Sequence, residues 1–81
     1  MFRRYEATVL VPPNVKGPQE AAGLEASGYV LIEHGPGSLE GWWSIRVAGD
    51  DDSLDAFVEG LKGSAHPSAV IAAHLADTAM T

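Results

Sequence analysis

Apolar and polar residues alternate in three short segments of the chain, and alternation with period two is typical of β-strands that bury one face. These segments are residues 5–11, 29–34 and 42–47, and a fourth apolar segment, rich in alanine, covers residues 69–75. The first segment ends at Pro12-Pro13, where two residues lack the N–H group that a strand ladder needs. The pattern therefore predicts four strands.

Two other segments carry the signals of helices. The first begins at Gly17-Pro18 and ends at Gly28, and a proline in the first turn with a glycine after the last turn is the usual asymmetry of helix ends. In the second, apolar residues recur at the i, i+3, i+4 and i+7 spacing of a helix that buries one stripe. These residues are Leu54, Phe57, Val58 and Leu61, and Gly63 ends the segment.

The predicted elements follow the order β-α-β-β-α-β within a single domain, residues 1–81. This order is that of the ferredoxin-like, or split βαβ, arrangement. Because connections are right-handed and do not cross, we expect an α+β two-layer sandwich with a four-stranded, mainly antiparallel sheet and two helices on one face. Residues 1–4 and 77–81 show no period and are expected to fray.

Two adjacent tryptophans start the third predicted strand, and neighbours on a strand point to opposite faces. We expect Trp43 to enter the core and Trp42 to lie on the face that the helices leave open. The core side should then also hold Val9, Val11, Ile45, Val47, Val30 and Ile32. The open face should carry an apolar patch that binds a partner protein, formed by Trp42, Leu10, Leu31 and Tyr29, with Arg46 at its border as a further contact residue.

Composition excludes several classes of function. The chain has no cysteine, which removes disulfides, thiolate metal sites and cysteine nucleophiles and favours a cytoplasmic location. Eleven acidic residues against five basic ones give a net charge of −6, and such a surface repels a phosphate backbone. The longest uncharged apolar run, residues 69–73, is too short to span a membrane. We therefore expect neither nucleic acid nor a membrane as a partner.

No residue pattern typical of catalysis or metal binding is found. His34, His66 and His74 lack the spacing of metal ligands, and no serine lies in a G-x-S-x-G turn. The run Asp50-Asp51-Asp52 is not a calcium loop, because the sixth position is Asp55 where a glycine is needed. We predict no catalytic residues, no metal and no cofactor, and so no enzymatic activity.

One short segment offers a different function. Lys16-Gly17 directly precedes the first predicted helix, where an anion could bind at the helix N-terminus. Residues 9–24, followed by 28–32, resemble the opening half of ACT regulatory domains, which bind amino acids and share the ferredoxin-like fold. The resemblance covers under half of the chain, and residues 12–17 lack the acidic residue and Pro-Gly that ACT domains usually carry at the ligand turn.

The sequence thus predicts a small non-enzymatic module that dimerises or binds a partner protein through Trp42 and its neighbours. A small, acidic, cysteine-free domain fits an accessory or inhibitory protein, including one made by a phage. A homodimer is expected, because so short a chain buries only a little over half of the surface that its unfolded form exposes and gains from covering one more apolar face. The alternative is an ACT-like regulatory domain that holds an anionic metabolite near Lys16, Gly17 and Pro18.

Overall fold

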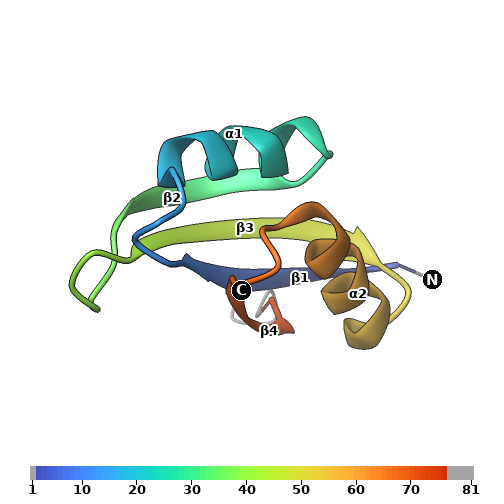
Figure 1. Ribbon diagram of the computed structural model, residues 1–81. Coiled ribbons are helices and arrows are strands. Elements are labelled where there is room, and N and C mark those ends of the chain that lie inside the picture. Colours follow the sequence, from blue (N-terminus) through green and yellow to red (C-terminus); the bar gives the residue numbers. More distant parts are fainter. Residues whose placement is uncertain (1, 77–81) are drawn as a thin grey trace.

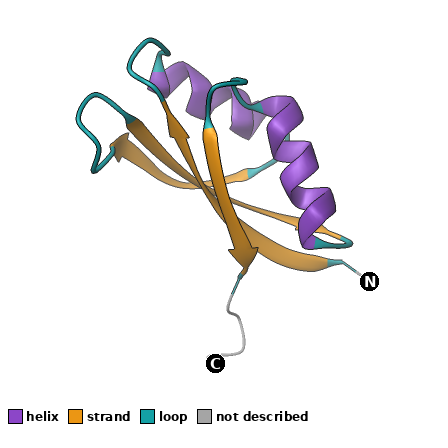
Figure 2. Ribbon diagram, turned by 60° about the horizontal axis from the view of Figure 1, so that its bottom comes forward, coloured by secondary structure: helices purple, strands orange, loops and turns teal. Residues whose placement is uncertain are grey.

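The computed structural model describes residues 2–76, which form a sheet with two helices on one side (Figures 1 and 2). The elements are β1 (Arg3–Val11), α1 (Gly17–Ala26), β2 (Val30–Pro36), β3 (Trp43–Asp51), α2 (Leu54–Ser64) and β4 (Val70–Leu75). The strand order is β2-β3-β1-β4, and every neighbouring pair is antiparallel. This is the ferredoxin-like α+β sandwich that the element order predicts.

The first strand begins closer to the N-terminus than the sequence predicts. Arg3 and Arg4 belong to β1, where they pair with Asp51 and Asp50 of β3. Fraying of these two residues was therefore a wrong prediction, and the reason is that β3 continues far enough to give them partners. The predicted fraying of residues 77–81 lies outside the described residues, as does that of Met1.

The hydrophobic core lies between the sheet and the helices. Alternate residues of β1 and β3 face the helices, and α1 and α2 each contribute one apolar stripe to the same layer. The buried residues of this cluster are Tyr5, Ala7, Val9, Val11, Ala21, Leu24, Ile45, Val47, Phe57 and Leu61. The period of two in the strands and of 3.6 in the helices is thus satisfied by one shared core.

Both helices begin where their sequence signals predict, and α1 ends just before the predicted glycine, whereas α2 continues through Gly63 to Ser64. The Ser53 hydroxyl accepts a hydrogen bond from the Ala56 N–H at 3.2 Å and so caps the start of α2. Gly28, with φ of 106°, follows α1 in the left-handed region that a glycine adopts without strain. Around it the Gly28 N–H bonds to Glu25 and the Tyr29 N–H bonds to Leu24, as in a Schellman motif.

Trp43 faces the core, as the sequence predicts. It packs at the edge of the core, however, and is only half-buried. Its ring covers Gly17, the first residue of α1: a Cβ atom on Gly17 would lie 2.1 Å from Trp43 Cγ. The Trp43 Nε1–H donates a hydrogen bond to His34 Nδ1 on β2 at 3.2 Å. Trp43 therefore joins the start of α1 to the two strands β2 and β3.

Candidate functional site

The open face of the sheet is the side opposite to α1 and α2, and no described element covers it (Figure 2). Cross-strand partners share a face, so the strand register identifies its residues. They are Arg4, Glu6, Thr8 and Leu10 of β1; Ser44, Arg46, Ala48 and Asp50 of β3; Val70, Ala72 and His74 of β4; and Val30 and Glu33 of β2.

Arg46 lies at the centre of the open face between two carboxylates. Its Nη1 donates to Glu33 on β2 at 3.1 Å, and its Nη2 donates to Glu6 on β1 at 3.3 Å. These hydrogen bonds, with Glu33 first and Glu6 second, raise the pKa of Arg46 above its ordinary value, so it stays charged. Arg4 and Asp50 form a further ion pair at 2.9 Å. The charges of the open face are therefore paired across three neighbouring strands.

Two of the five residues predicted for the apolar patch lie on the other side of the sheet. Leu31 pairs with the buried Val47, and both Leu31 and Tyr29 pack against the core. Their placement on the open face was wrong. The cause is a β-bulge in β2 between Leu31 and Glu33, which inserts one unpaired residue, Ile32. A bulge reverses the alternation, because the residues before it change face relative to those after it.

The same bulge brings Val30 and Ile32 out of the predicted core. Val30 pairs with Ala48 on the open face and is 51% exposed, and Ile32 is 42% exposed. Tyr29 takes the space on the helix side, where its ring packs edge-on against Phe57 with centroids 5.9 Å apart. Burial raises the pKa of the Tyr29 hydroxyl above its ordinary value. Tyr29 is therefore a packing residue of the helix side.

The other three predicted residues remain together on the open face. Arg46 and Leu10 occupy it by register, and Trp42 extends it by one position. Although Trp42 precedes β3, its C=O accepts a hydrogen bond from the Gly37 N–H at 2.7 Å, which continues the β2–β3 ladder. Trp42 consequently shares a face with Ser44, two residues on. Leu10 also pairs with Val70 of β4, so Trp42, Leu10 and Val70 form what we call the apolar end of the open face.

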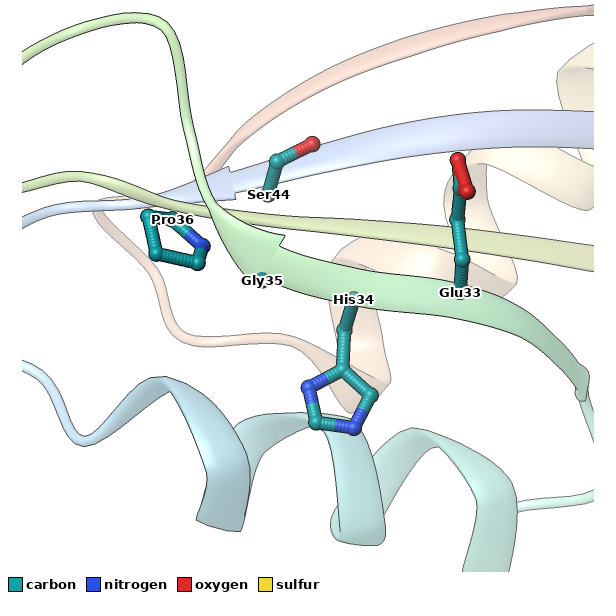
Figure 3. Close-up of a pocket in the computed structure, with 5 residues that line it drawn as sticks. All are labelled: Glu33, His34, Gly35, Pro36 and Ser44. Atoms are coloured by element: carbon teal, nitrogen blue, oxygen red, sulfur yellow. The ribbon is translucent and has the colours of Figure 1, made fainter.

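A hollow of about 230 Å³ lies along β2 and is lined by Glu33, His34, Gly35, Pro36 and Ser44 (Figure 3). Its floor is Gly35, which has no side chain and pairs with Ser44, and Glu33 borders it along β2. Figure 3 shows Glu33 and Ser44 on one side of β2 and the His34 ring on the other, toward α1. Ser44, His34 and Glu33 therefore do not form a catalytic triad, because the imidazole lies across the strand from the hydroxyl.

The other two histidines, His66 and His74, lie outside this hollow. His66 Nδ1 accepts a hydrogen bond from the Ser68 N–H at 3.0 Å, and the His66 N–H donates to the Glu20 carboxylate at 2.6 Å. His74 pairs with Glu6 across β1 and β4. Among residues 2–76, no group of three or more His, Asp or Glu side chains is placed to hold a metal ion. Within the same residues, neither helix is long and apolar enough to cross a membrane.

The predicted anion site at Lys16 and Gly17 offers little to a ligand. Lys16 is the N-cap residue of α1, as the sequence suggests. Gly17, however, is buried beneath Trp43, Pro18 has no N–H to donate, and Glu20 adds a negative charge to the first turn. An anion would meet one lysine with few available backbone donors.

We expect amino acids and phosphorylated metabolites to leave the midpoint of thermal unfolding unchanged. A ligand present at a hundred times its dissociation constant would stabilise the fold by about 2.7 kcal/mol and raise the midpoint by roughly 10–20 °C. A thermal-shift screen measures this directly. A compound that raises the midpoint for the native chain but not for Lys16→Ala would restore the ACT-like alternative.

Comparison with known proteins adds no assignment to these residues. The chain matches no protein-family model, no curated protein and no solved structure. The candidate function therefore rests on the chemistry and geometry of the open face.

Proposed function

We propose that this protein is a small non-enzymatic interaction module that forms a homodimer by packing the open faces of two sheets against each other. The apolar end with Trp42 supplies the anchor, and Arg46 with its two carboxylates supplies the polar part of the contact. Such a module fits an accessory or inhibitory role, and the lack of cysteine supports a cytoplasmic setting for it.

The distribution of charge carries this proposal. The open face holds two arginines, Arg4 and Arg46, against three carboxylates, whereas the rest of the described chain holds three basic and seven acidic residues. Two copies of a chain with net charge −6 repel each other wherever their acidic surfaces meet. The open face is nearly balanced, so it is the broad surface at which a second copy meets least repulsion.

The pattern on this face also suits contact with itself. A contact between two identical copies is usually two-fold symmetric, so each surface patch must complement itself. The row Glu6, Arg46 and Glu33 alternates in sign, which lets the arginine of each copy approach the carboxylates of the other. Trp42 then packs near the hollow over Gly35, where the missing side chain leaves room.

Replacing Trp42 with alanine is expected to weaken dimerisation about 30-fold, or about 2 kcal/mol, because Trp42 is only half-buried and aromatic anchors carry a large share of contact energy. The fold should persist, since Trp42 precedes β3 and is not one of the buried core residues. Light scattering over a range of concentrations measures the solution mass and hence the dissociation constant.

Leu54→Ala is the matched control for this experiment. Leu54 is an apolar residue, 38% exposed, at the start of α2 on the helix side, and its removal should leave the dimer unchanged. The proposal would be abandoned if Trp42→Ala and Leu10→Glu both kept the native dissociation constant, or if the native chain stayed monomeric at millimolar concentration.

A further inference from the structure

The two edges of the sheet differ in how well they are protected against pairing. Unprotected edges pair with other strands, and proteins block this with charges, prolines or bulges. The edge strand β2 has all three devices, in Glu33, Pro36 and the bulge at Ile32. The other edge strand, β4, has the sequence VIAAHL, without a charged residue or a proline, and its register with β1 runs without a bulge.

The free side of β4 presents three pairs of backbone groups. The Ala76 N–H bonds to the Arg4 C=O at 3.0 Å, which shows that Ala76 directs its backbone groups toward β1. Because these directions alternate along an antiparallel strand, Ala72 and His74 also bond to β1. The N–H and C=O groups of Ile71, Ala73 and Leu75 point the other way, to an edge that no described strand occupies (Figure 2).

We propose that β4 pairs antiparallel with β4 of a second copy, about a two-fold axis that passes between the Ala73 residues of the two copies. In this register Ala73 lies opposite itself, and Ile71 of each copy lies opposite Leu75 of the other. Every outward N–H and C=O of the three residues then finds a partner. The two sheets become one sheet of eight strands, with all helices on the same side.

The side chains around β4 complement this register. Leu75 and Ile71 both lie on the helix side, since they pair with Tyr5 and Val9. Leu75 is 50% exposed. Beside Ile71 there is a hollow of about 210 Å³, lined by Lys62, His66, Pro67, Ala69 and Ile71. The two-fold axis places Leu75 of each copy at this hollow of the other.

Charge also permits two copies to meet at this edge. Of the five basic residues in the chain, Lys62 lies beside the hollow at one end of β4, and Arg3 and Arg4 line another hollow, of about 390 Å³, at the other end. Basic side chains therefore lie at both ends of β4, where Lys62 is 4.0 Å from Glu59 and the His66 N–H donates to Glu20. The axis proposed here is perpendicular to the sheet, so edge pairing leaves the open face free, and the contact described under Proposed function can form or fail independently.

Amide hydrogen exchange on the native chain, followed residue by residue at low and high concentration, tests the pairing. We expect the amides of Ile71, Ala73 and Leu75 to exchange quickly in the monomer and to be protected at least 100-fold in the dimer. The amides of Ala72 and His74, which bond to β1, should be protected in both states. Only a strand on the free side of β4 gives this alternating response.

Two variants complete the test. Ala73→Pro removes an outward N–H that has no role within the sheet, and Leu75→Lys places a charge on the edge; each should abolish the concentration-dependent protection. Ile32→Lys is the matched control, at a 42%-exposed residue of the opposite edge. It should leave the concentration-dependent protection of the β4 amides unchanged.

The outcomes separate the two contacts. If Ile71, Ala73 and Leu75 exchange as free amides at a concentration where the mass is that of a dimer, edge pairing is refuted and the open face remains the contact. If instead the edge variants reduce the mass and Trp42→Ala does not, edge pairing holds and the open-face proposal fails. Failure of both Ala73→Pro and Leu75→Lys to change protection would also refute edge pairing.

Discussion

Replacing Phe57 with alanine is expected to lower the free energy of unfolding by about 3–5 kcal/mol, the range measured when a buried aromatic side chain is removed. Phe57 is 1% exposed, and its ring stacks on Tyr5 with centroids 5.6 Å apart and meets Tyr29 edge-on. It is the largest fully buried side chain of the described core. Removing the Phe57 ring would leave a cavity between α2 and the sheet. Because a domain of 81 residues is stabilised by roughly 4–12 kcal/mol, the loss can exceed half of the total.

Urea unfolding followed by tryptophan fluorescence measures this change. Val58→Ala is the control, because Val58 is the next residue of α2 and is only half-buried, so its truncation should cost much less. Phe57→Leu should recover most of the stability, since it restores apolar volume. A loss below about 1 kcal/mol for Phe57→Ala would mean that the aromatic cluster of Tyr5, Tyr29 and Phe57 does not hold α2 on the sheet.

The fold was predictable because its signals are local and agree with one another. The alternation in β1 places Tyr5, Ala7, Val9 and Val11 on one face, and each of these residues is buried as that alternation requires. The spacing of Phe57 and Leu61 in α2 and the glycine that follows α1 act within a few residues of chain. Once such elements are arranged as β-α-β-β-α-β, the rules for connections leave few alternatives to a ferredoxin-like sandwich.

The site was predicted only in part, because the bulge in β2 has no local signal. Residues 29–34 alternate without interruption, and a uniform alternation assigns Tyr29 and Leu31 to the open face. What favours the bulge is packing at a distance. A Cβ on Gly49 would come within 3.2 Å of the Tyr29 ring, and a Cβ on Gly60 within 2.9 Å of its hydroxyl. Tyr29 thus packs where two residues of β3 and α2 have no side chains, which the sequence of β2 alone does not show.

The prediction of which residues share the open face was more successful for β1 and β3, which pair regularly. Trp42, Leu10 and Arg46 share the open face because β1 and β3 pair without a bulge over nine residues. Sequence analysis did not include Val70 in this face, although it pairs with Leu10, because the apolar residues of β4 do not alternate with polar ones. β4 is an edge strand with no charged residue and no proline, so it lacks the protection that the opposite edge strand, β2, has.

Gly17→Ala is expected to destabilise the fold by about 1–3 kcal/mol, although alanine usually favours a helix, because the new methyl group overlaps the Trp43 ring. A Cβ at this position would lie 2.1 Å from Trp43 Cγ and 2.5 Å from Trp43 Cβ, so the indole or the start of α1 must move. Gly23→Ala is the matched control in the same helix. No atom lies within 4 Å of its added methyl group, and it should stabilise the chain by roughly 0.5–1 kcal/mol.

A double-mutant cycle assigns the cost of Gly17→Ala to Trp43. Trp43→Ala alone should cost about 3 kcal/mol, near the lower limit for a tryptophan because Trp43 is only half-buried. In that background Gly17→Ala should cost almost nothing, which gives a coupling energy of about 1–3 kcal/mol between the two residues. Additive costs would show that the glycine is needed for another reason. A coupling of the expected size would show that Gly17 is required because Trp43, the inward-facing member of the tryptophan pair, packs directly on the start of α1.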